Sequence, residues 1–255
     1  TTNSSLYNAN LTTDPLEVHL QLPHINQTTR KGIDSLAIRG NVTDDCVVAN
    51  GALENATINI TVPQENYFCS PVNDEGSGWY NCTIPVADPV TNDWTYGHYN
   101  LTLNATKKYY NSSSTLNRQD AFRLVSNPQM YGLTLTSQCD DPVGSGTCSD
   151  FGWGEVWTFN ASMRDQDQSE PSLSEELNIS LYVNVSGGWR LLNSTIRDDL
   201  SIWKDIQLNF DEFNCSDIGS REFMFNITDI YGYHNSSNTS KKIEKDTVFI
   251  YHESE

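Results

Sequence analysis

The sequence predicts an all-β protein with two tandem antiparallel β-sandwich domains. Short runs of alternating apolar and polar residues, the period of a half-buried strand, recur along the chain between Gly, Pro, Asn and Asp. No window has a convincing helical period. Two stretches resemble each other: GHYNLTLNAT at 97–106 and GSREFMFNIT at 219–228 share an initial Gly, the alternation and a final Asn-x-Thr. A repeat of about 120 residues has the length of a whole domain.

Other similar segments support the repeat. Two pairs of Asn-x-Ser/Thr triplets are 119 residues apart: Asn41 with Asn160, and Asn59 with Asn178. Trp79 and Trp189 each follow a Gly and precede another triplet, at a spacing of 110 residues. Because a binding residue seldom recurs in both copies of a repeated core, we interpret these two tryptophans as equivalent packing residues.

The repeat sets the expected domain boundaries. We predict a polar arm or linker at 1–15, a first sandwich at 16–127 and a second at 128–255. The segment between the sandwiches is short and contains Pro128, which predicts a stiff link and an elongated pair of domains. The clearest strands are expected at 16–23, 36–42, 57–62, 97–106 and 122–125 in the first copy, and at 131–136, 177–185, 219–228 and 248–251 in the second.

The charge balance excludes two classes of partner. The chain has 33 acidic and 15 basic residues, a net charge of −18. Nucleic acids and anionic membrane surfaces both require clustered Lys and Arg, so neither is expected to bind. No apolar run approaches 18 residues, so we expect no membrane insertion by this chain and no signal peptide. Its polar start and its end just after a strand lead us to expect a mature product or a piece of a longer protein.

Glycosylation acceptors indicate the compartment. The chain has 26 Asn and 49 Ser plus Thr, from which random placement gives roughly five Asn-x-Ser/Thr triplets. It has 18, an excess that predicts N-linked glycosylation of an extracellular or cell-surface protein. The acceptors are Asn3, Asn10, Asn26, Asn41, Asn55, Asn59, Asn81, Asn100, Asn104, Asn111, Asn160, Asn178, Asn184, Asn193, Asn214, Asn226, Asn235 and Asn238. The alternative is that Asn and Thr merely favour solvated strand faces.

The six cysteines are expected to form disulfides in an oxidising compartment. Cys69 and Cys82 flank a short turn and are placed to staple a hairpin, and so are Cys139 and Cys148, which leaves Cys46 and Cys215. The sequence does not choose among the possible pairings. A metal site is the alternative, but the chain lacks Cys-x-x-Cys and paired His spacings.

Catalytic signatures are absent from the sequence. The five histidines are scattered, and the chain has no HExxH, GxSxG, P-loop or dinucleotide motif, so we do not expect an enzyme. Asp165, Asp167 and Glu170 place oxygen ligands at spacings typical of calcium loops, without the Gly and terminal Glu of an EF-hand. The alternative is a solvated acidic loop. Beyond a calcium ion and covalent glycans, no cofactor is expected.

Together, the tandem domains, short strands, acidic balance, dense acceptors and segments such as NITDIYG at 226–232 resemble the immunoglobulin-like modules of archaeal cell-surface glycoproteins, of the surface-layer, adhesin-like or filament-forming type. This resemblance implies a structural role, in which copies of the chain form a filament, sheath or layer through end-to-end or strand-addition contacts. The alternative is a binding module, such as an adhesin, receptor or viral attachment ectodomain, that recognises a protein or glycan.

Overall fold

The computed structural model describes residues 16–44, 53–85, 93–108, 110, 114–137, 152, 155–173, 175–185 and 187–244. The chain forms two compact units, Thr1–Val125 (unit 1) and Ser126–Glu255 (unit 2). Several predicted features lie outside the described residues: the arm at 1–15, the strand at 248–251, Asn3, Asn10, Asn111, Cys46, Cys139 and Cys148.

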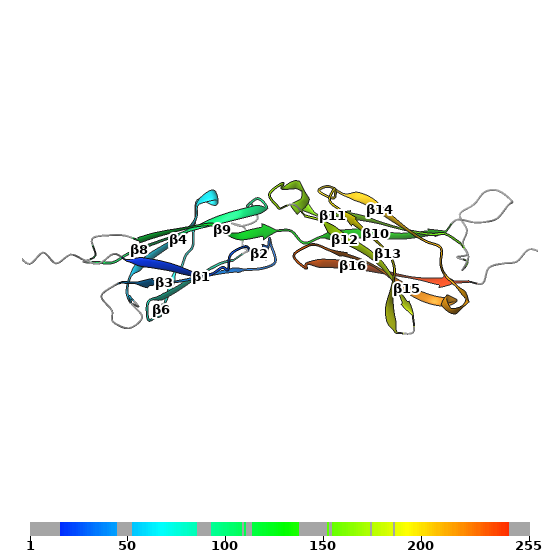
Figure 1. Ribbon diagram of the computed structural model, residues 1–255, viewed down its shortest axis with the longest axis horizontal. Coiled ribbons are helices and arrows are strands. Elements are labelled where there is room, and N and C mark those ends of the chain that lie inside the picture. Colours follow the sequence, from blue (N-terminus) through cyan, green and yellow to red (C-terminus); the bar gives the residue numbers. More distant parts are fainter. Residues whose placement is uncertain are drawn as a thin grey trace, which may run out of the picture. The chain divides into compact units, whose positions relative to one another are not determined.

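Unit 1 is a sandwich of two sheets (Figure 1). The β3 sheet has the order β1 (Glu17–Leu22), β3 (Leu36–Thr43), β7 (Trp79–Ile84), β6 (Asn73–Gly76). The β8 sheet has the order β2 (Gln27–Arg30), β9 (Ser114–Val125), β8 (Gly97–Thr106), β4 (Thr57–Val62), β5 (Tyr67–Phe68). The short edge strand β2 pairs with β9 in parallel, whereas the other strand pairs of unit 1 are antiparallel.

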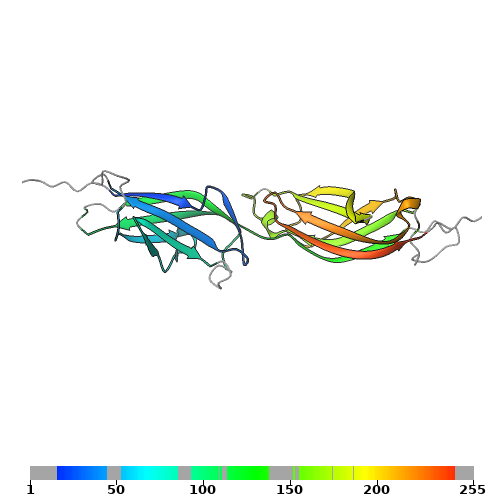
Figure 2. The same ribbon diagram turned by 90° about the horizontal axis from the view of Figure 1, so that it is seen from below.

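Unit 2 is also a two-sheet sandwich. The β11 sheet has the order β10 (Gln129–Ser137), β11 (Trp157–Arg164), β14 (Lys204–Phe210). The β15 sheet has the order β13 (Gly188–Arg197), β12 (Leu177–Val185), β15 (Gly219–Thr228), β16 (His234–Ile243). Figure 2 shows β15 and β16, in orange and red, running side by side. Short 3-10 helices complete the described elements: η1 (Pro63–Glu65) in unit 1, and η2 (Gln166–Ser169) and η3 (Cys215–Asp217) in unit 2.

The two units have corresponding strand orders. The series β1-β3-β7 of unit 1 matches β10-β11-β14 of unit 2, and β9-β8-β4-β5 matches β16-β15-β12-β13. Three strands facing four, joined by Greek-key connections, are the arrangement of immunoglobulin-like sandwiches. The all-β, immunoglobulin-like fold class predicted from the sequence is confirmed. No helix among the described residues has the length and apolar character needed to cross a membrane.

Alternation of side chains explains the two cores. Along β8, Leu101, Leu103 and Ala105 are buried while the residues between them are partly exposed. Along β15, Phe223 and Phe225 are buried in the same way. Successive side chains of a strand point to opposite faces, so one face of each sheet supplies the core. Burying each large apolar side chain contributes about 1.5–3 kcal/mol, which makes these faces the main stabilising feature of each unit.

The disulfide of unit 1 joins its two sheets. Cys69 follows β5 in the β8 sheet, and Cys82 lies in β7 of the β3 sheet. The two cysteines are bonded, both are buried, and their Cα atoms are 6.2 Å apart. The predicted pairing of Cys69 with Cys82 is therefore present, but it links opposite sheets across the core and does not staple a hairpin. Cys215 is exposed in η3 and has no disulfide partner among the described residues.

The strand pairing corrects two details of the predicted repeat. Trp79 lies in β7 and Trp189 in β13, which pair with non-equivalent strands, so the prediction that these tryptophans are equivalent is wrong. Trp189 is also 41% exposed and is not a core residue. Asn104 pairs with Asn59, whereas its counterpart Asn226 pairs with Ser180. Position 59 therefore corresponds to position 180, and the predicted match of Asn59 with Asn178 is displaced by two residues.

Candidate functional site

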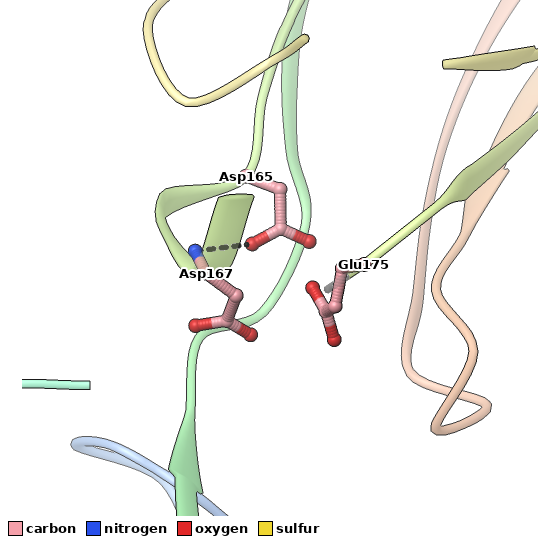
Figure 3. A group of neighbouring side chains, drawn as sticks. All are labelled: Asp165, Asp167 and Glu175. Carbon is pink, nitrogen blue, oxygen red and sulfur yellow. Dashed lines mark hydrogen bonds between the residues drawn. The ribbon is translucent and has the colours of Figure 1, made fainter. Parts of the chain in front are cut away.

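Four buried carboxylates gather at one end of unit 2. Asp165 directly follows β11, Asp167 lies in η2, Glu175 precedes β12 by two residues, and Asp229 directly follows β15. All four residues are buried: Asp165 and Asp167 are 0% exposed, Glu175 is 3% exposed and Asp229 is 6% exposed. One carboxylate oxygen from each of Asp165, Asp167 and Glu175 lies within 4.8 Å of the other two, and Figure 3 shows the three side chains facing a common space. The ends of separate strands thus bring these acids together.

Ser126, the first residue of unit 2, orients two of the carboxylates. Its backbone N–H donates to Asp167 Oδ1 at 2.7 Å, and its hydroxyl donates to Asp165 Oδ1. The Asp167 N–H also donates to Asp165 Oδ1, at 3.1 Å, because Asp165 caps η2 (Figure 3). The Oδ2 atoms of both aspartates are buried and accept no hydrogen bond. Each carboxylate is therefore held by one oxygen and presents the other.

Asp229 and Glu175 extend the same pattern. Asp229 Oδ1 accepts hydrogen bonds from the backbone N–H groups of Tyr231 and Tyr233, both at 2.8 Å. Asp229 Oδ2 and both Oε atoms of Glu175 are buried without a hydrogen-bond partner. Within the described part of the chain, no Lys, Arg or His forms an ion pair with any of the four acids. Five buried carboxylate oxygens are left unsatisfied.

The electrostatics of the cluster favour proton uptake when nothing else neutralises it. Burial raises the pKa of Asp165, and burial together with the charge of Asp165 raises the pKa of Asp167 to about 7. Burial raises the pKa of Asp229 to about 6 against the lowering effect of its backbone hydrogen bonds. Burial, followed by the charges of its acidic neighbours, places the pKa of Glu175 well above the ordinary value. Ionised carboxylates are disfavoured here because low polarity and like charges act in the same direction.

A surface pocket of about 380 Å³ opens beside the cluster. Glu170, Glu175, Glu176 and Asp198 line it, together with Gln168, Pro171 and Ile230. Glu170 is half-buried and its carboxylate accepts a hydrogen bond from Ser172 at 3.2 Å. The structure therefore brings the predicted Asp165 and Asp167 together but puts Glu175 in the place expected for Glu170, which lines the adjoining pocket instead.

The second set of predicted site residues, the acceptor asparagines, lies at the surface. None of the 15 acceptors within the described residues is buried. They occupy the β3 sheet (Asn41, Asn81), the β8 sheet (Asn59, Asn100, Asn104), the β11 sheet (Asn160), the β15 sheet (Asn178, Asn184, Asn193, Asn226, Asn235, Asn238) and the segments between strands (Asn26, Asn55, Asn214). Both sheets of both units therefore carry acceptors.

Two of these acceptors are turned toward the core side of a sheet edge. Asn193 is paired with buried Leu181, and its Nδ2 donates to the Asn209 carbonyl at 2.9 Å. Asn235 is paired with buried Ile227, and its Nδ2 donates to the Pro128 carbonyl at 3.2 Å. The nitrogen that would carry a glycan is engaged with backbone in both, so these are the least suited acceptors of the described set.

An exposed aromatic pair lies beside the β11 sheet. Tyr131 of β10 is 54% exposed and Trp203, just before β14, is 38% exposed. Their rings meet edge to face with centroids 4.5 Å apart. The guanidinium of Arg164 lies 4.9 Å from the Trp203 ring centroid. The only acceptor that the described residues place in this sheet is Asn160.

Sequence reasoning missed Glu175 and Asp229. Asp229 is in the NITDIYG segment and Glu175 sits in an ordinary acidic loop, SLSEEL. The sequence feature that could have identified them is their position, because both acids lie within two residues of a strand end, as Asp165 does. Spacing along one loop could not show that three strand ends meet.

Comparisons with known proteins find matches among solved structures, all at low sequence identity. No protein family matches the sequence, and no curated protein matches it either. Domains A168–A170 of titin match with 9% identity over 89% of this chain and 65% of that chain, at a TM-score of 0.47. The three N-terminal domains of the bacteriophage RB49 outer capsid protein Hoc match with 12% identity over 91% of this chain and 71% of that one, at a TM-score of 0.44.

A 1.5-MDa bacterial ice-binding adhesin matches with 12% identity over 92% of this chain and 67% of that one, at a TM-score of 0.40. This chain thus spans slightly less than two thirds of the titin fragment. At these identities and TM-scores the likenesses carry no argument about function.

Proposed function

We propose that this chain is an N-glycosylated, extracellular structural module of a cell surface that assembles with copies of itself. The observation that supports the proposal is the placement of the acceptors, which lie on both sheets of both units and avoid the buried positions. A receptor-binding domain needs one broad bare face, whereas a structural module can be sugar-coated on every lateral face.

Physical reasoning about the remaining surface favours contacts through strands and ends. Glycans on the outward sheet faces leave the sheet edges and the ends of each sandwich for protein contacts. Edge strands present unpaired backbone N–H and C=O groups, and adding a strand satisfies them. Strands β5 and β6 are short edges of unit 1, and β13 is an edge of unit 2. The proposed assembly is a filament, sheath or layer of the type found in archaeal surface glycoproteins.

Other features fit an extracellular setting. The disulfide between Cys69 and Cys82 is typical of oxidising compartments. The net charge of −18 keeps a sugar-coated chain soluble and disfavours binding to nucleic acid. The partner that we propose is a second copy of this chain, which would bind through the edge strands and ends that the glycans leave free.

Site-resolved glycopeptide mass spectrometry of the native protein, together with electron microscopy, tests the proposal. We expect glycans on outward-facing acceptors such as Asn59, Asn104 and Asn178, no glycan on Asn193 or Asn235, and regular polymers. Asn104→Gln should remove one glycan, whereas Asn117→Gln, on the neighbouring strand β9 but outside any triplet, should remove none. A dispersed monomer with few occupied acceptors would contradict the proposal.

An extracellular binding module is the second candidate. The observation that favours it is the exposed pair of Tyr131 and Trp203, on the sheet with a single described acceptor. Large exposed aromatic side chains with a polar rim are typical of recognition surfaces. Binding of native protein to a glycan and cell-surface protein array, lost in Trp203→Ala and retained in Trp189→Ala, would favour this candidate.

A further inference from the structure

The carboxylate cluster of unit 2 differs from the other buried acids of the described chain. Asp217 of unit 2 is buried, and Arg190 pairs with it at 3.1 Å. Asp44 of unit 1 is buried, and the Tyr110 hydroxyl donates to it. Buried charges that lack a protein partner require a counter-ion or a proton, because transfer of an ionised group from water to the interior is strongly unfavourable. In the cluster, Glu175 lies within hydrogen-bonding reach of Asp165 and Asp167, so the carboxyl groups can satisfy one another only by sharing protons, and no described Lys, Arg or His pairs with them.

The donor atoms of the cluster select a class of ion. All of them are carboxylate oxygens, and neither His nitrogen nor Cys sulfur is among the grouped side chains. Oxygen-only sites suit Ca²⁺ and Mg²⁺ rather than zinc or copper. Ca²⁺ binds oxygen at about 2.3–2.6 Å, so ligands on opposite sides of the ion are about 5 Å apart, which fits the 4.8 Å spread. Mg²⁺ demands near-ideal octahedral geometry with oxygens at about 2.0–2.1 Å, a tighter arrangement than the 4.8 Å spread of these oxygens.

We propose that unit 2 binds one calcium ion through Asp165, Asp167 and Glu175, with the negative charge of Asp229 beside them. The unpartnered Oδ2 atoms of the two aspartates and both Glu175 oxygens are the ligands, while the Oδ1 atoms hold the carboxylates in place. Waters complete the usual six to eight ligands. The acid-lined pocket that reaches Glu175 gives the ion its access from solvent. Binding also fastens Ser126 to the sandwich of unit 2 through its two hydrogen bonds.

The described residues of unit 1 show the same strand ends without a comparable group of carboxylates. The strand register makes Glu54 the counterpart of Glu175, and Asp44 and Lys107 follow β3 and β8 as Asp165 and Asp229 follow β11 and β15. Glu54 is exposed and accepts a hydrogen bond from the Ser77 N–H at 3.1 Å. Lys107 donates from Nζ to the Glu54 carbonyl. Because Lys107 stands where unit 2 has Asp229, this end of unit 1 has its own positive charge and is not expected to bind a cation. Unit 1 therefore serves as an internal control.

Calorimetric titration of the full chain with CaCl₂ after treatment with a chelator tests the proposal, with MgCl₂ as the comparison. We expect one calcium ion per chain with a dissociation constant below about 1 mM, and weaker binding of magnesium. Saturating calcium should raise the thermal transition of unit 2 by about 5–10 °C. Absence of binding together with an unchanged transition would overturn the proposal, because carboxylic acids neutralised by protons alone do not respond to calcium at fixed pH.

Three variants locate the ion. Glu175→Gln should weaken calcium binding at least about tenfold, whereas its counterpart Glu54→Gln should leave binding unchanged. Asp229→Lys places an ammonium group where unit 1 has Lys107, so it should abolish calcium binding and raise the transition of unit 2 in chelator. This variant keeps the test decisive if Glu175→Gln folds poorly. Calcium binding that persists unchanged in both Glu175→Gln and Asp229→Lys would place the ion elsewhere and overturn the assignment.

Discussion

Unit 1 joins its two sheets with the disulfide between Cys69 and Cys82, whereas unit 2 packs aromatic rings at the corresponding place in its core. Cys82 pairs across strands with Ile38, and at the corresponding place in unit 2 Leu208 pairs with Phe159. Phe159 lies 5.2 Å from Phe223, which is 5.5 Å from Trp157, measured between ring centroids. The same strand order thus tolerates two different ways of holding the sheets together.

The two units also differ in the polar residues that follow their strands. Near its strand ends unit 1 has Lys107, bonded to the Glu54 carbonyl, and the Tyr110 hydroxyl, which donates to Asp44, while unit 2 concentrates carboxylates without a cationic partner there. The strand faces determine the fold, because both units keep the alternation of buried residues. Residues just beyond the strands are free to diverge, and in unit 2 they have become a site.

The largest effect is expected from equivalent core truncations. Leu101 of β8 and Phe223 of β15 hold the same place in the two units, and both are fully buried. Phe223→Ala should destabilise unit 2 by about 3–5 kcal/mol, and Leu101→Ala should destabilise unit 1 by about 2–5 kcal/mol, because each leaves a cavity. Urea unfolding monitored for each unit measures the two costs. A loss below 1 kcal/mol for Phe223→Ala would show that the aromatic cluster does not hold unit 2.

Removing the disulfide should affect unit 1 alone. The bond closes a loop with a sequence separation of 13 residues, for which the loss of unfolded-state constraint is about 3 kcal/mol. The double variant Cys69→Ala/Cys82→Ala should therefore lower the free energy of unfolding of unit 1 by about that amount. Cys215→Ser, at an exposed position, is the matched control and should change neither unit. An equal loss in unit 2 would contradict the independence of the two cores.

In the presence of a chelator, the free energy of unfolding of unit 2 should fall as the pH rises. The folded-state pKa values of Asp229, about 6, and Asp167, about 7, lie above the ordinary 3.8, so the folded unit keeps protons that the unfolded chain releases. The resulting stabilisation is fully present below about pH 4 and is lost as the pH rises through 6 to 7. From pH 4.5 to 7.5 unit 2 should lose at least about 2 kcal/mol, the amount that the raised pKa of Asp229 alone contributes over this range.

Unit 1 is the control for this experiment. Hydrogen bonds from Arg30 lower the pKa of Asp34, whose stabilising effect is lost only when the pH falls below the ordinary value. Unit 1 should therefore stay nearly constant between pH 4.5 and 7.5. If unit 2 became more stable at pH 7.5 in chelator, the carboxylates would not be buried as described.

The smallest change expected is in the hydrogen bond to Asp44. Tyr110→Phe removes the hydroxyl that donates to this buried carboxylate in unit 1. The loss should be about 1–2 kcal/mol, because a buried acceptor loses a donor that water cannot fully replace. Added calcium should not restore the stability, since the described residues of unit 1 hold no such carboxylate cluster. Restoration by calcium would mean that unit 1 also holds an ion.

Strand faces were the part of the fold that sequence could predict. The ranges 97–106 and 219–228 are the observed bounds of β8 and β15, because five alternating positions leave one register that buries the apolar set. Strand β2 was not predicted, since QTTR has no apolar alternation. The prediction that Trp79 and Trp189 are equivalent failed because the same Gly-Trp pair occurs at two strands, β7 and β13, that do not correspond.

The carboxylate site was predicted only in part. The spacing of Asp165 and Asp167 in one loop pointed to oxygen ligands, but Glu170 was chosen by proximity in sequence. Glu175 and Asp229 are brought to the cluster by the packing of β12 and β15 against β11, which no local pattern encodes. Unsatisfied oxygens at strand ends become visible only when the sandwich is assembled.

Differential scanning calorimetry of the full chain in calcium and in chelator, and of the Cys69→Ala/Cys82→Ala variant, tests the contrast between the units most directly. Two transitions are expected. Calcium should raise only the transition of unit 2, and the double substitution should lower only that of unit 1, because the proposed ion and the disulfide between Cys69 and Cys82 belong to different units. A calcium response in the transition that the double substitution shifts, or no calcium response in either, would contradict this account.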